Sequence, residues 1–114
     1  MDTEKQKLNL LCDAAQLLLE NGSETYRVEE TAQRMAKGLN IEHVNIAALP
    51  TTVFLEADGR ACVRRISRRG TNSQRIAMVN EISRRIERGE MTPDMAKAEL
   101  ERARRMPGFS QRTM

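Results

Sequence analysis

The sequence predicts an α+β domain: a helical hairpin, a three-stranded antiparallel meander, and then two helices packed on the sheet. Three observations predict this order. Apolar residues recur with a helical period near the N-terminus, the period changes to two between residues 43 and 66, and the helical period returns after residue 72. A chain of 114 residues is long enough for one domain with a modest core.

The first helix is predicted from about Thr3 to Asn21, because one face of this segment is apolar. That face consists of Leu8, Leu11, Cys12, Ala15, Leu18 and Leu19. Gly22 follows directly, and a glycine past the last helical turn adopts the left-handed conformation at little cost. We therefore expect the helix to end at this glycine.

A second helix is predicted from about Glu24 to Lys37, ending at Gly38. Ser23 or Thr25 is the expected cap of its first free N–H groups. Since the connection between the two helices is so short, they are expected to pack antiparallel as a hairpin.

The middle of the chain is predicted to form three strands. Residues 43–49 alternate in polarity and are followed by Pro50, and residues 51–56 are β-branched and aromatic. The pair Asp58-Gly59 is a strong hairpin turn signal, after which residues 60–66 resume the strand pattern. Two tight reversals then give the meander.

Two helices are predicted after the strands. The third is capped by Asn72 or Ser73 and ends at Gly89. Its apolar positions are Ile76, Val79, Ile82 and Ile86. The fourth has Thr92 as its cap and Pro93 at the first helical position, where the missing N–H costs nothing.

The composition excludes several classes of protein. No apolar run approaches the roughly 18–20 residues that cross a bilayer, and no secretory signal begins the chain. The polypeptide as given is therefore expected to be soluble. The two cysteines, Cys12 and Cys62, are expected to be buried free thiols in a reducing compartment, with a disulfide between them as the alternative.

Charge is distributed unevenly along the chain. Residues 1–57 hold five basic and nine acidic side chains, net −4, whereas residues 58–114 hold fourteen basic and seven acidic ones, net +7. A basic half has three interpretations: a nucleic-acid surface, a membrane-facing surface, or ordinary solvated helix faces.

The corner between the first two helices is the first candidate site. It gathers a hydroxyl, a phenol, a guanidinium and carboxylates near a helix N-terminus, on residues Glu24, Thr25, Tyr26, Arg27 and Glu29. Such a site can hold the carboxylate of an amino acid or dicarboxylate. The alternative is a capped helix start in which the arginine pairs with a neighbouring glutamate.

A second candidate cluster combines residues from the strands and the loop that follows them. Its members are Thr51, Thr52, Arg65, Asn72 and Arg75. As a functional site they would form a polar pocket between the sheet edge and the loop before the third helix. The favoured interpretation is turn and cap chemistry with solvated arginines.

Catalytic signals are sparse. His43 is the only histidine, and no Cys, His and Asp cluster has metal-ligand spacing. Neither a glycine-rich phosphate loop nor a Gly-x-Ser-x-Gly elbow is present. The prediction is that the protein is not an enzyme and has no catalytic residue, metal ligand or cofactor.

Five motifs follow one another along the chain: Gly22–Thr31, Thr51-Thr52, Arg65 with Ser67, Arg69–Asn72, and Ile76–Asn80. Taken in order, they resemble the N-terminal soluble domain of the threonine/serine exporter family. The resemblance covers nearly the whole chain.

This resemblance implies that residues 1–114 form a single cytoplasmic domain at the N-terminal end of a longer, multi-spanning membrane protein of the cell membrane. The family exports small amino acids such as threonine and serine, and related split systems export dicarboxylates such as succinate. The implied partners are the transmembrane helices of the parent protein or a companion membrane subunit, together with the cargo. A homo-oligomer is a further candidate assembly, because apolar faces that lack their membrane partners would be buried by a second copy of the chain.

The arginines near the C-terminus fit this placement, since positive charge beside a membrane helix is held on the cytoplasmic side. They are Arg102, Arg104, Arg105 and Arg112. The alternative is that arginines near a helix C-terminus interact favourably with the helix dipole.

Two other functions stay open as alternatives. The basic segment of residues 64–75 is dense in groups that contact phosphate, as in a nucleic-acid-binding module. It lacks the interleaved aromatic residues on which single-strand binders stack bases, so no nucleic-acid partner is expected. The last alternative is a small hydrolase-like cytoplasmic domain.

Overall fold

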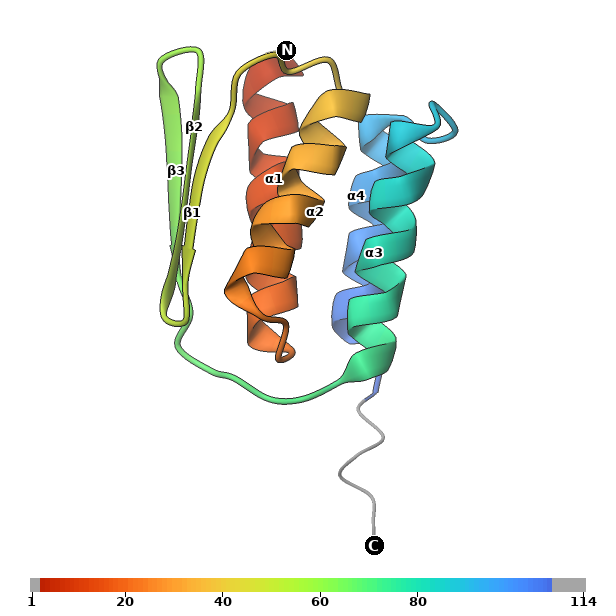
Figure 1. Ribbon diagram of the computed structural model, residues 1–114. Coiled ribbons are helices and arrows are strands. Elements are labelled where there is room, and N and C mark those ends of the chain that lie inside the picture. The colour runs from red at the N-terminus through yellow and green to blue at the C-terminus, as the bar shows by residue number, and fades with distance from the viewer. Residues whose placement is uncertain (1–2, 108–114) are drawn as a thin grey trace, which may run out of the picture.

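The computed structural model describes residues 3–107, and its elements follow the predicted order (Figure 1). They are α1 (Thr3–Glu20), α2 (Thr25–Gly38), β1 (Asn45–Leu49), β2 (Thr52–Ala57), β3 (Arg60–Arg65), α3 (Ser73–Glu87) and α4 (Pro93–Arg105). The predicted α+β class is confirmed. We use "base" for the end of the domain where α1 and α4 end and α2 and α3 begin, at the bottom of Figure 1.

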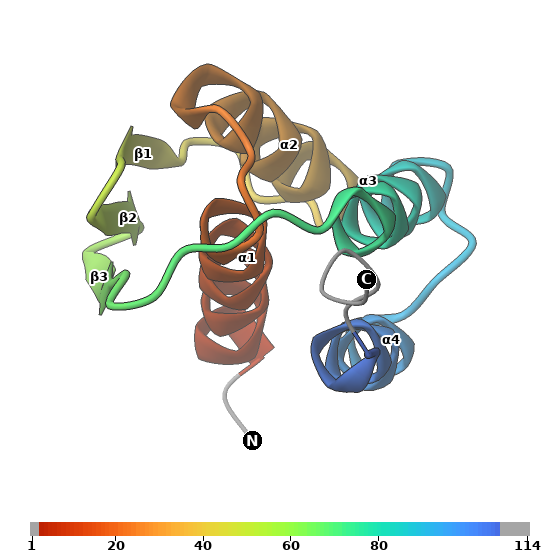
Figure 2. The same cartoon turned by 90° about the horizontal axis from the view of Figure 1, so that it is seen from below.

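Helix α1 is the centre of the domain, because it is apolar around most of its circumference. The sequence predicted one buried face, but Leu10, Ala14 and Leu17 are buried as well. Figure 2 shows α1 between the sheet on one side and α3 and α4 on the other. A helix with apolar residues all round needs neighbours on every side, and α1 contacts β2, β3 and the three other helices.

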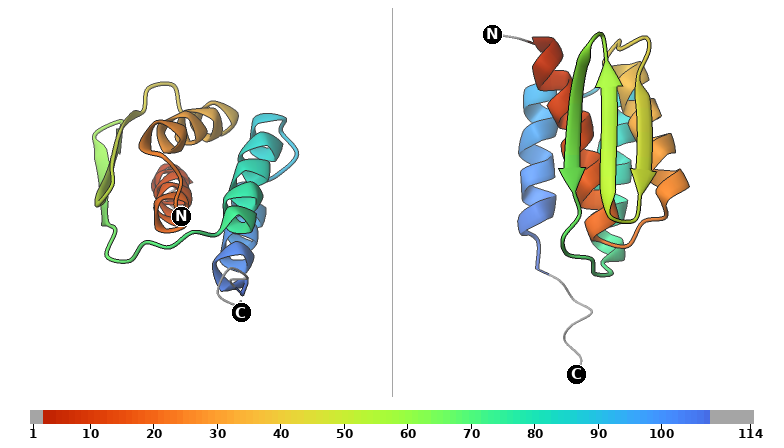
Figure 3. Two further views of the ribbon diagram at one scale, coloured as in Figure 1. Left: turned by 60° about the horizontal axis from the view of Figure 1, so that its bottom comes forward. Right: turned by 90° about the vertical axis from the view of Figure 1, so that its left-hand side faces the viewer.

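The sheet is an antiparallel meander in the order β1-β2-β3, as predicted. Asp58 and Gly59 have φ angles of 54° and 80°, which is the left-handed pair that a two-residue hairpin turn requires. Helices α1 and α2 cover one face of the sheet. No helix within residues 3–107 lies over the other face (Figure 3, right), where Leu49, Phe54 and Val63 are exposed.

The position of the last two helices differs from the prediction. They were expected on the sheet, but α3 packs against α1 and α2, and α4 packs against α1 and α3. The physical reason is the second apolar side of α1, which the three strands leave uncovered. The helices therefore form a layer on the far side of the hairpin from the sheet (Figure 1).

Helices α2 and α3 approach each other closely at Gly38. A Cβ atom on this residue would lie 2.5 Å from the Ile86 carbonyl oxygen. Polar contacts join the same two helices, since Arg34 Nη1 donates to Ser83 Oγ at 3.1 Å. Helix α2 ends at Gly38 as predicted, but the left-handed residue is Asn40, with a φ of 63°.

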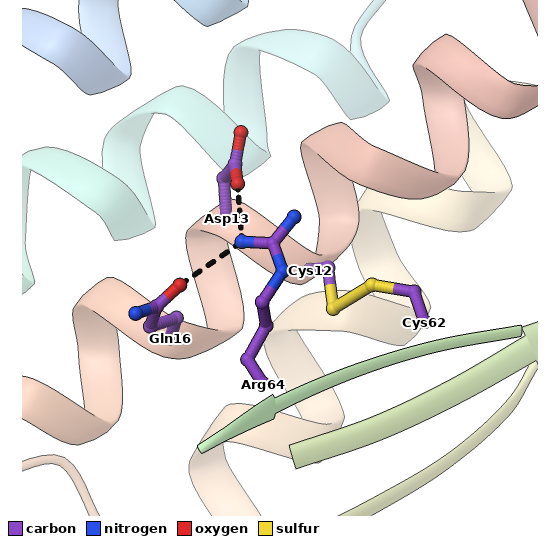
Figure 4. The surroundings of a disulfide bond; sticks show 5 residues. All are labelled: Cys12, Asp13, Gln16, Cys62 and Arg64. Carbon is purple, nitrogen blue, oxygen red and sulfur yellow. Dashed lines mark hydrogen bonds and ion pairs between the residues drawn. A yellow bond between two sulfur atoms is a disulfide. The ribbon is translucent and has the colours of Figure 1, made fainter. Parts of the chain in front are cut away.

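The two cysteines are joined, so the expectation of free thiols was wrong. Cys12 of α1 and Cys62 of β3 form a disulfide across the interface between helix and sheet (Figure 4). Their Cα atoms lie 6.7 Å apart, within the range that a disulfide spans. Beside the bridge, Arg64 Nη1 donates to Asp13 Oδ1 at 2.6 Å and to Gln16 Oε1 at 2.9 Å. Because the cysteines are bonded, they no longer support the expectation of a reducing compartment.

We expect the Asn45→Ala substitution to raise the pKa of the Glu56 carboxyl towards its ordinary value of 4.5. In the native chain, hydrogen bonds from Asn45 Nδ2 and then from the Gly59 N–H hold that pKa below its ordinary value. These bonds favour the charged carboxylate, so their stabilisation is present above the unfolded-state pKa and is lost as the pH falls through the folded-state pKa. An NMR titration of the carboxyl carbon measures the change.

The exposed Gln74→Ala variant serves as the control for this titration, and its Glu56 pKa should match that of the native chain. An unaltered Glu56 pKa in the Asn45→Ala variant would contradict the prediction.

Candidate functional site

The end of α1 determines how the predicted corner begins. Gly22 has a φ of 100°, and the N–H of Ser23 donates to the Leu18 carbonyl at 3.0 Å. This pattern is the usual glycine-based end of a helix, and it fixes Ser23 as the last residue of the α1 cap. Glu24 is left as the N-cap of α2, and its side chain makes no capping hydrogen bond. The prediction that Ser23 or Thr25 caps α2 was therefore wrong.

Tyr26 and Arg27 form an exposed pair in the first turn of α2. The Arg27 guanidinium carbon lies 5.7 Å from the centre of the Tyr26 ring, within the range of a cation–π contact. A hydrogen bond with Tyr26 is the main cause that raises the pKa of Arg27, and the Glu24 and Glu30 carboxylates act in the same direction. Tyr26 is 54% exposed. A phenol and a guanidinium are thus available together at the base.

Glu29 has a structural contact. Its Oε2 accepts a hydrogen bond from the N–H of Ala48 at 3.0 Å, which ties α2 to β1. A hollow of about 510 Å³ lies beside it, lined by Tyr26, Glu29, Glu30, Gln33 and Ile46. Thr25 is half-buried. The corner residues therefore split into an exposed pair, Tyr26 with Arg27, and a carboxylate that holds the sheet.

The second predicted cluster does not come together as one pocket. Thr52 and Arg65 are cross-strand neighbours in the β2–β3 register. They share a face with the exposed Phe54 and Val63, because side chains alternate along a strand. Asn72 is buried and caps α3, as predicted, by accepting from the Arg75 N–H at 3.1 Å. Thr52 and Arg65 thus lie on the open face of the sheet, whereas Asn72 faces the end of α1.

The reason for this separation is the path of the loop from β3 to α3. The Gly70 N–H donates to the Glu20 carbonyl at 2.8 Å, and the Asn72 N–H donates to the Asn21 carbonyl at 3.1 Å. Gly22 lies so close that a Cβ atom there would be 3.1 Å from the Gly70 oxygen. The loop is therefore fastened to the end of α1 and away from the sheet.

A different pocket results, which the sequence reasoning missed. It has a volume of about 470 Å³ and is formed at the base by the end of α1, the loop before α3, the first turn of α3 and the last turns of α4. We call it the arginine pocket. Its lining residues are Leu17, Glu20, Asn21, Arg68, Arg69, Gly70, Arg75 and Arg104.

Arg75 anchors the floor of the arginine pocket. Its Nη1 donates to Asn21 Oδ1 at 3.2 Å, and its Nη2 donates to the Met106 carbonyl. Arg75 Nε is buried and has no hydrogen-bond partner within residues 3–107. Arg104 lies 3.8 Å from the Glu20 carboxylate. The density of arginine in residues 64–75 was the one signal in the sequence, but the partners from α1 and α4 come from far along the chain.

The described part of the chain shows neither a metal site nor a membrane-spanning helix. Residues 3–107 contain no group of three or more His, Cys, Asp or Glu side chains that could hold a metal ion. Among the helices of that range, none combines the length and the apolar character that crossing a membrane requires.

Comparisons with known proteins give a single result. The model of a family described as "Putative threonine/serine exporter" matches residues 9–114. Neither the curated proteins nor the solved structures contain a match to the chain. The match covers most of the sequence and agrees with the resemblance of its motifs. This chain therefore belongs to the threonine/serine exporter family.

Proposed function

We propose that residues 1–114 are the cytoplasmic, N-terminal domain of a multi-spanning exporter in the cell membrane. In this proposal the domain contributes to the export of threonine, serine or a small dicarboxylate and performs no catalysis itself. The observation that carries the proposal is the family match over residues 9–114. The transmembrane helices of the parent protein, or a companion membrane subunit, are the proposed partners.

Charge at the base supports the cytoplasmic side. Helix α4 ends there with Arg102, Arg104 and Arg105 in its last turn, and positive charge beside membrane helices is held on the cytoplasmic side. Arg102 and Arg105 also pair with Glu99 and Glu101 of their own helix, which is the local alternative. Arg112 lies outside the described residues.

The disulfide is an argument in the other direction, because disulfides are rare in the cytosol. A topology experiment on the full-length protein decides between the two sides. Alkaline phosphatase and green fluorescent protein, fused in turn before Met1, report the compartment of the N-terminus. Fluorescence without phosphatase activity supports the cytoplasmic side, and the reverse result overturns it.

We propose that the exposed Tyr26–Arg27 pair at the base contacts the membrane-spanning part or the carboxylate of the cargo. The support is its position: it lies at the end of the domain where α4 also ends (Figure 1). A guanidinium binds a carboxylate through two parallel hydrogen bonds. The half-buried Glu29 keeps α2 attached to the sheet, so the pair projects from a fixed support.

The transport function itself is tested on the product of the full-length gene. Cells are loaded with threonine, serine or succinate, and efflux is compared with and without the gene. Faster efflux of any of these cargoes in the presence of the gene supports the proposal and identifies the cargo. Equal efflux for all three, with the protein verified in the membrane, overturns it.

We expect Arg27→Ala in the full-length protein to reduce efflux at least about tenfold, because it removes a charged hydrogen-bond donor worth about 1.5–3 kcal/mol. The isolated domain should keep its thermal unfolding midpoint, since the guanidinium is at the surface. The matched control is Arg84→Ala, an exposed arginine in the last turn of α3, away from the base. Undiminished efflux by a folded Arg27→Ala protein would refute the assignment of this residue.

A further inference from the structure

We propose that the arginine pocket binds the phosphate group of a phosphate monoester, either a soluble one or the head group of an anionic lipid. The inference concerns a site that the transport proposal does not use, and it does not depend on that proposal. It rests on the charge, the unsatisfied groups and the rigidity of the pocket.

Positive charge in the pocket is poorly compensated. Four arginine side chains and one carboxylate, Glu20, line the same cavity. The nearest approach of the carboxylate to any of them is a long one, 3.8 Å to Arg104 Nη1. Arginines elsewhere in the described chain have closer carboxylates, for example Arg64 with Asp13 at 2.6 Å and Arg88 with Glu90 at 2.8 Å. Like charges gathered in one hollow repel each other, and an anion removes that repulsion.

Three of the guanidinium groups keep N–H donors available to a ligand. Arg68 is exposed and has no hydrogen bond or ion pair within residues 3–107. Among residues 3–107, Arg104 has only the long contact with Glu20. Arg69 uses one nitrogen, Nη1, to donate to the Pro50 carbonyl at 3.2 Å, which leaves its other N–H groups. Each guanidinium presents five donors in a planar fork that matches the oxygens of phosphate.

The pocket is also fixed in place before any ligand arrives. Two backbone hydrogen bonds fasten the loop that carries Arg68 and Arg69 to the end of α1. The Arg75 side chain holds Asn21 on one side and the Met106 carbonyl on the other. Because the backbone and Arg75 are already ordered, a ligand has only the side chains of Arg68, Arg69 and Arg104 to order on binding.

The chemistry favours phosphate over a simple carboxylate. A phosphate monoester has a charge of about −1.5 to −2 at pH 7 and three acceptor oxygens, whereas a carboxylate has one charge and two oxygens. Arg68, Arg69 and Arg104 all have free donors, so together they suit the three oxygens of a phosphate better than the two of a carboxylate. The volume of about 470 Å³ exceeds what a bare phosphate fills, which leaves space for the organic portion of an ester. Volumes of this size are usual for small-molecule sites.

The test uses the 114-residue chain and isothermal titration with three probes: glycerol 3-phosphate, inorganic phosphate and succinate. A fourth arm measures co-sedimentation with phosphatidylcholine vesicles, with and without phosphatidic acid. We expect glycerol 3-phosphate to bind more tightly than succinate, or the chain to sediment only with the vesicles that contain phosphatidic acid. The first result identifies a soluble ester as the ligand, and the second identifies a lipid head group.

The decisive variant is Arg68→Gln with Arg104→Gln. It removes two guanidinium groups whose one contact within residues 3–107 is the long ion pair of Arg104 with Glu20. Its affinity should fall by at least about tenfold, since one charged hydrogen bond contributes roughly that much. The matched control is Arg84→Gln with Arg88→Gln, which loses the same charge outside the pocket. Its affinity should stay within about twofold of the native value, because exposed charges act weakly at a distance in salt.

Three outcomes would overturn the proposal. They are no binding in any arm, succinate binding as tightly as glycerol 3-phosphate, and an equal loss of affinity in the two double variants. Thermal unfolding of both variants checks that the comparison is made between folded proteins.

Discussion

Reduction of the Cys12–Cys62 disulfide is expected to lower the free energy of unfolding by about 4 kcal/mol, the largest effect that we predict. The bridge joins residues 50 apart in the sequence. Closing a loop of that length removes conformational entropy from the unfolded chain, and the chain-entropy relation gives about 4 kcal/mol for it. Urea unfolding with and without dithiothreitol measures the difference, with mass spectrometry to confirm reduction.

The control for this experiment is the Cys62→Ala variant, which cannot form the bridge. Its stability should equal that of the reduced native chain to within about 1 kcal/mol, because Cys62 is only half-buried. It should not respond to dithiothreitol, since Cys12 is then the one cysteine left. If the fully reduced native chain unfolds at the same urea concentration as the oxidised chain, the predicted stabilisation is refuted.

The clash created by Gly38→Ala is expected to cost about 1–3 kcal/mol, the range for overpacked interiors, so the domain should lose up to about 2 kcal/mol of net stability. The new Cβ atom would lie 2.5 Å from the Ile86 oxygen and 2.8 Å from the Glu87 Cα atom. Both are backbone atoms of α3, so no side-chain rotation relieves the clash and the two helices must separate. This loss outweighs the gain of about 1 kcal/mol that alanine gives a helix over glycine. Urea unfolding measures the net change.

Gly70→Ala is the matched control, because its Cβ atom would meet only the Glu20 oxygen, at 3.9 Å, an ordinary contact. Its stability should change by less than about 0.5 kcal/mol. A Gly38→Ala protein as stable as the native chain would mean that α2 and α3 separate without cost, contrary to the prediction.

The elements of this fold were predictable from local signals. Each of these signals depends on residues within a few positions of one another, and each is present in the structure. They are the hydrophobic period, the Asp58-Gly59 turn, the Asn72 cap and the Thr92-Pro93 helix start. The order of the layers was harder to predict from the sequence. The periodic pattern indicated one buried face of α1, and the burial of Leu17 on another side shows that it needs a second layer of cover.

The candidate site was predictable only in part, and the reason is sequence separation. The Tyr26–Arg27 pair is local, because the two residues are neighbours in the first turn of α2. The arginine pocket joins Glu20, Arg68 and Arg104, which no periodic pattern relates. The disulfide depends in the same way on the register of α1 against β3. The proposed roles of the predicted site residues stay predictions until the binding and efflux experiments are made.

The central place of α1 has a consequence for the synthesis of this protein on the ribosome. Within the described residues α1 precedes all of its neighbours, and α3 and α4, which cover its second side, come last. The side of α1 that packs against α3 and α4 therefore stays exposed to water until the residues of α4 are available. Exposed apolar surface of this kind invites aggregation and recruits chaperones. Shortened products that stop before α4 should aggregate readily and be degraded quickly in the cell.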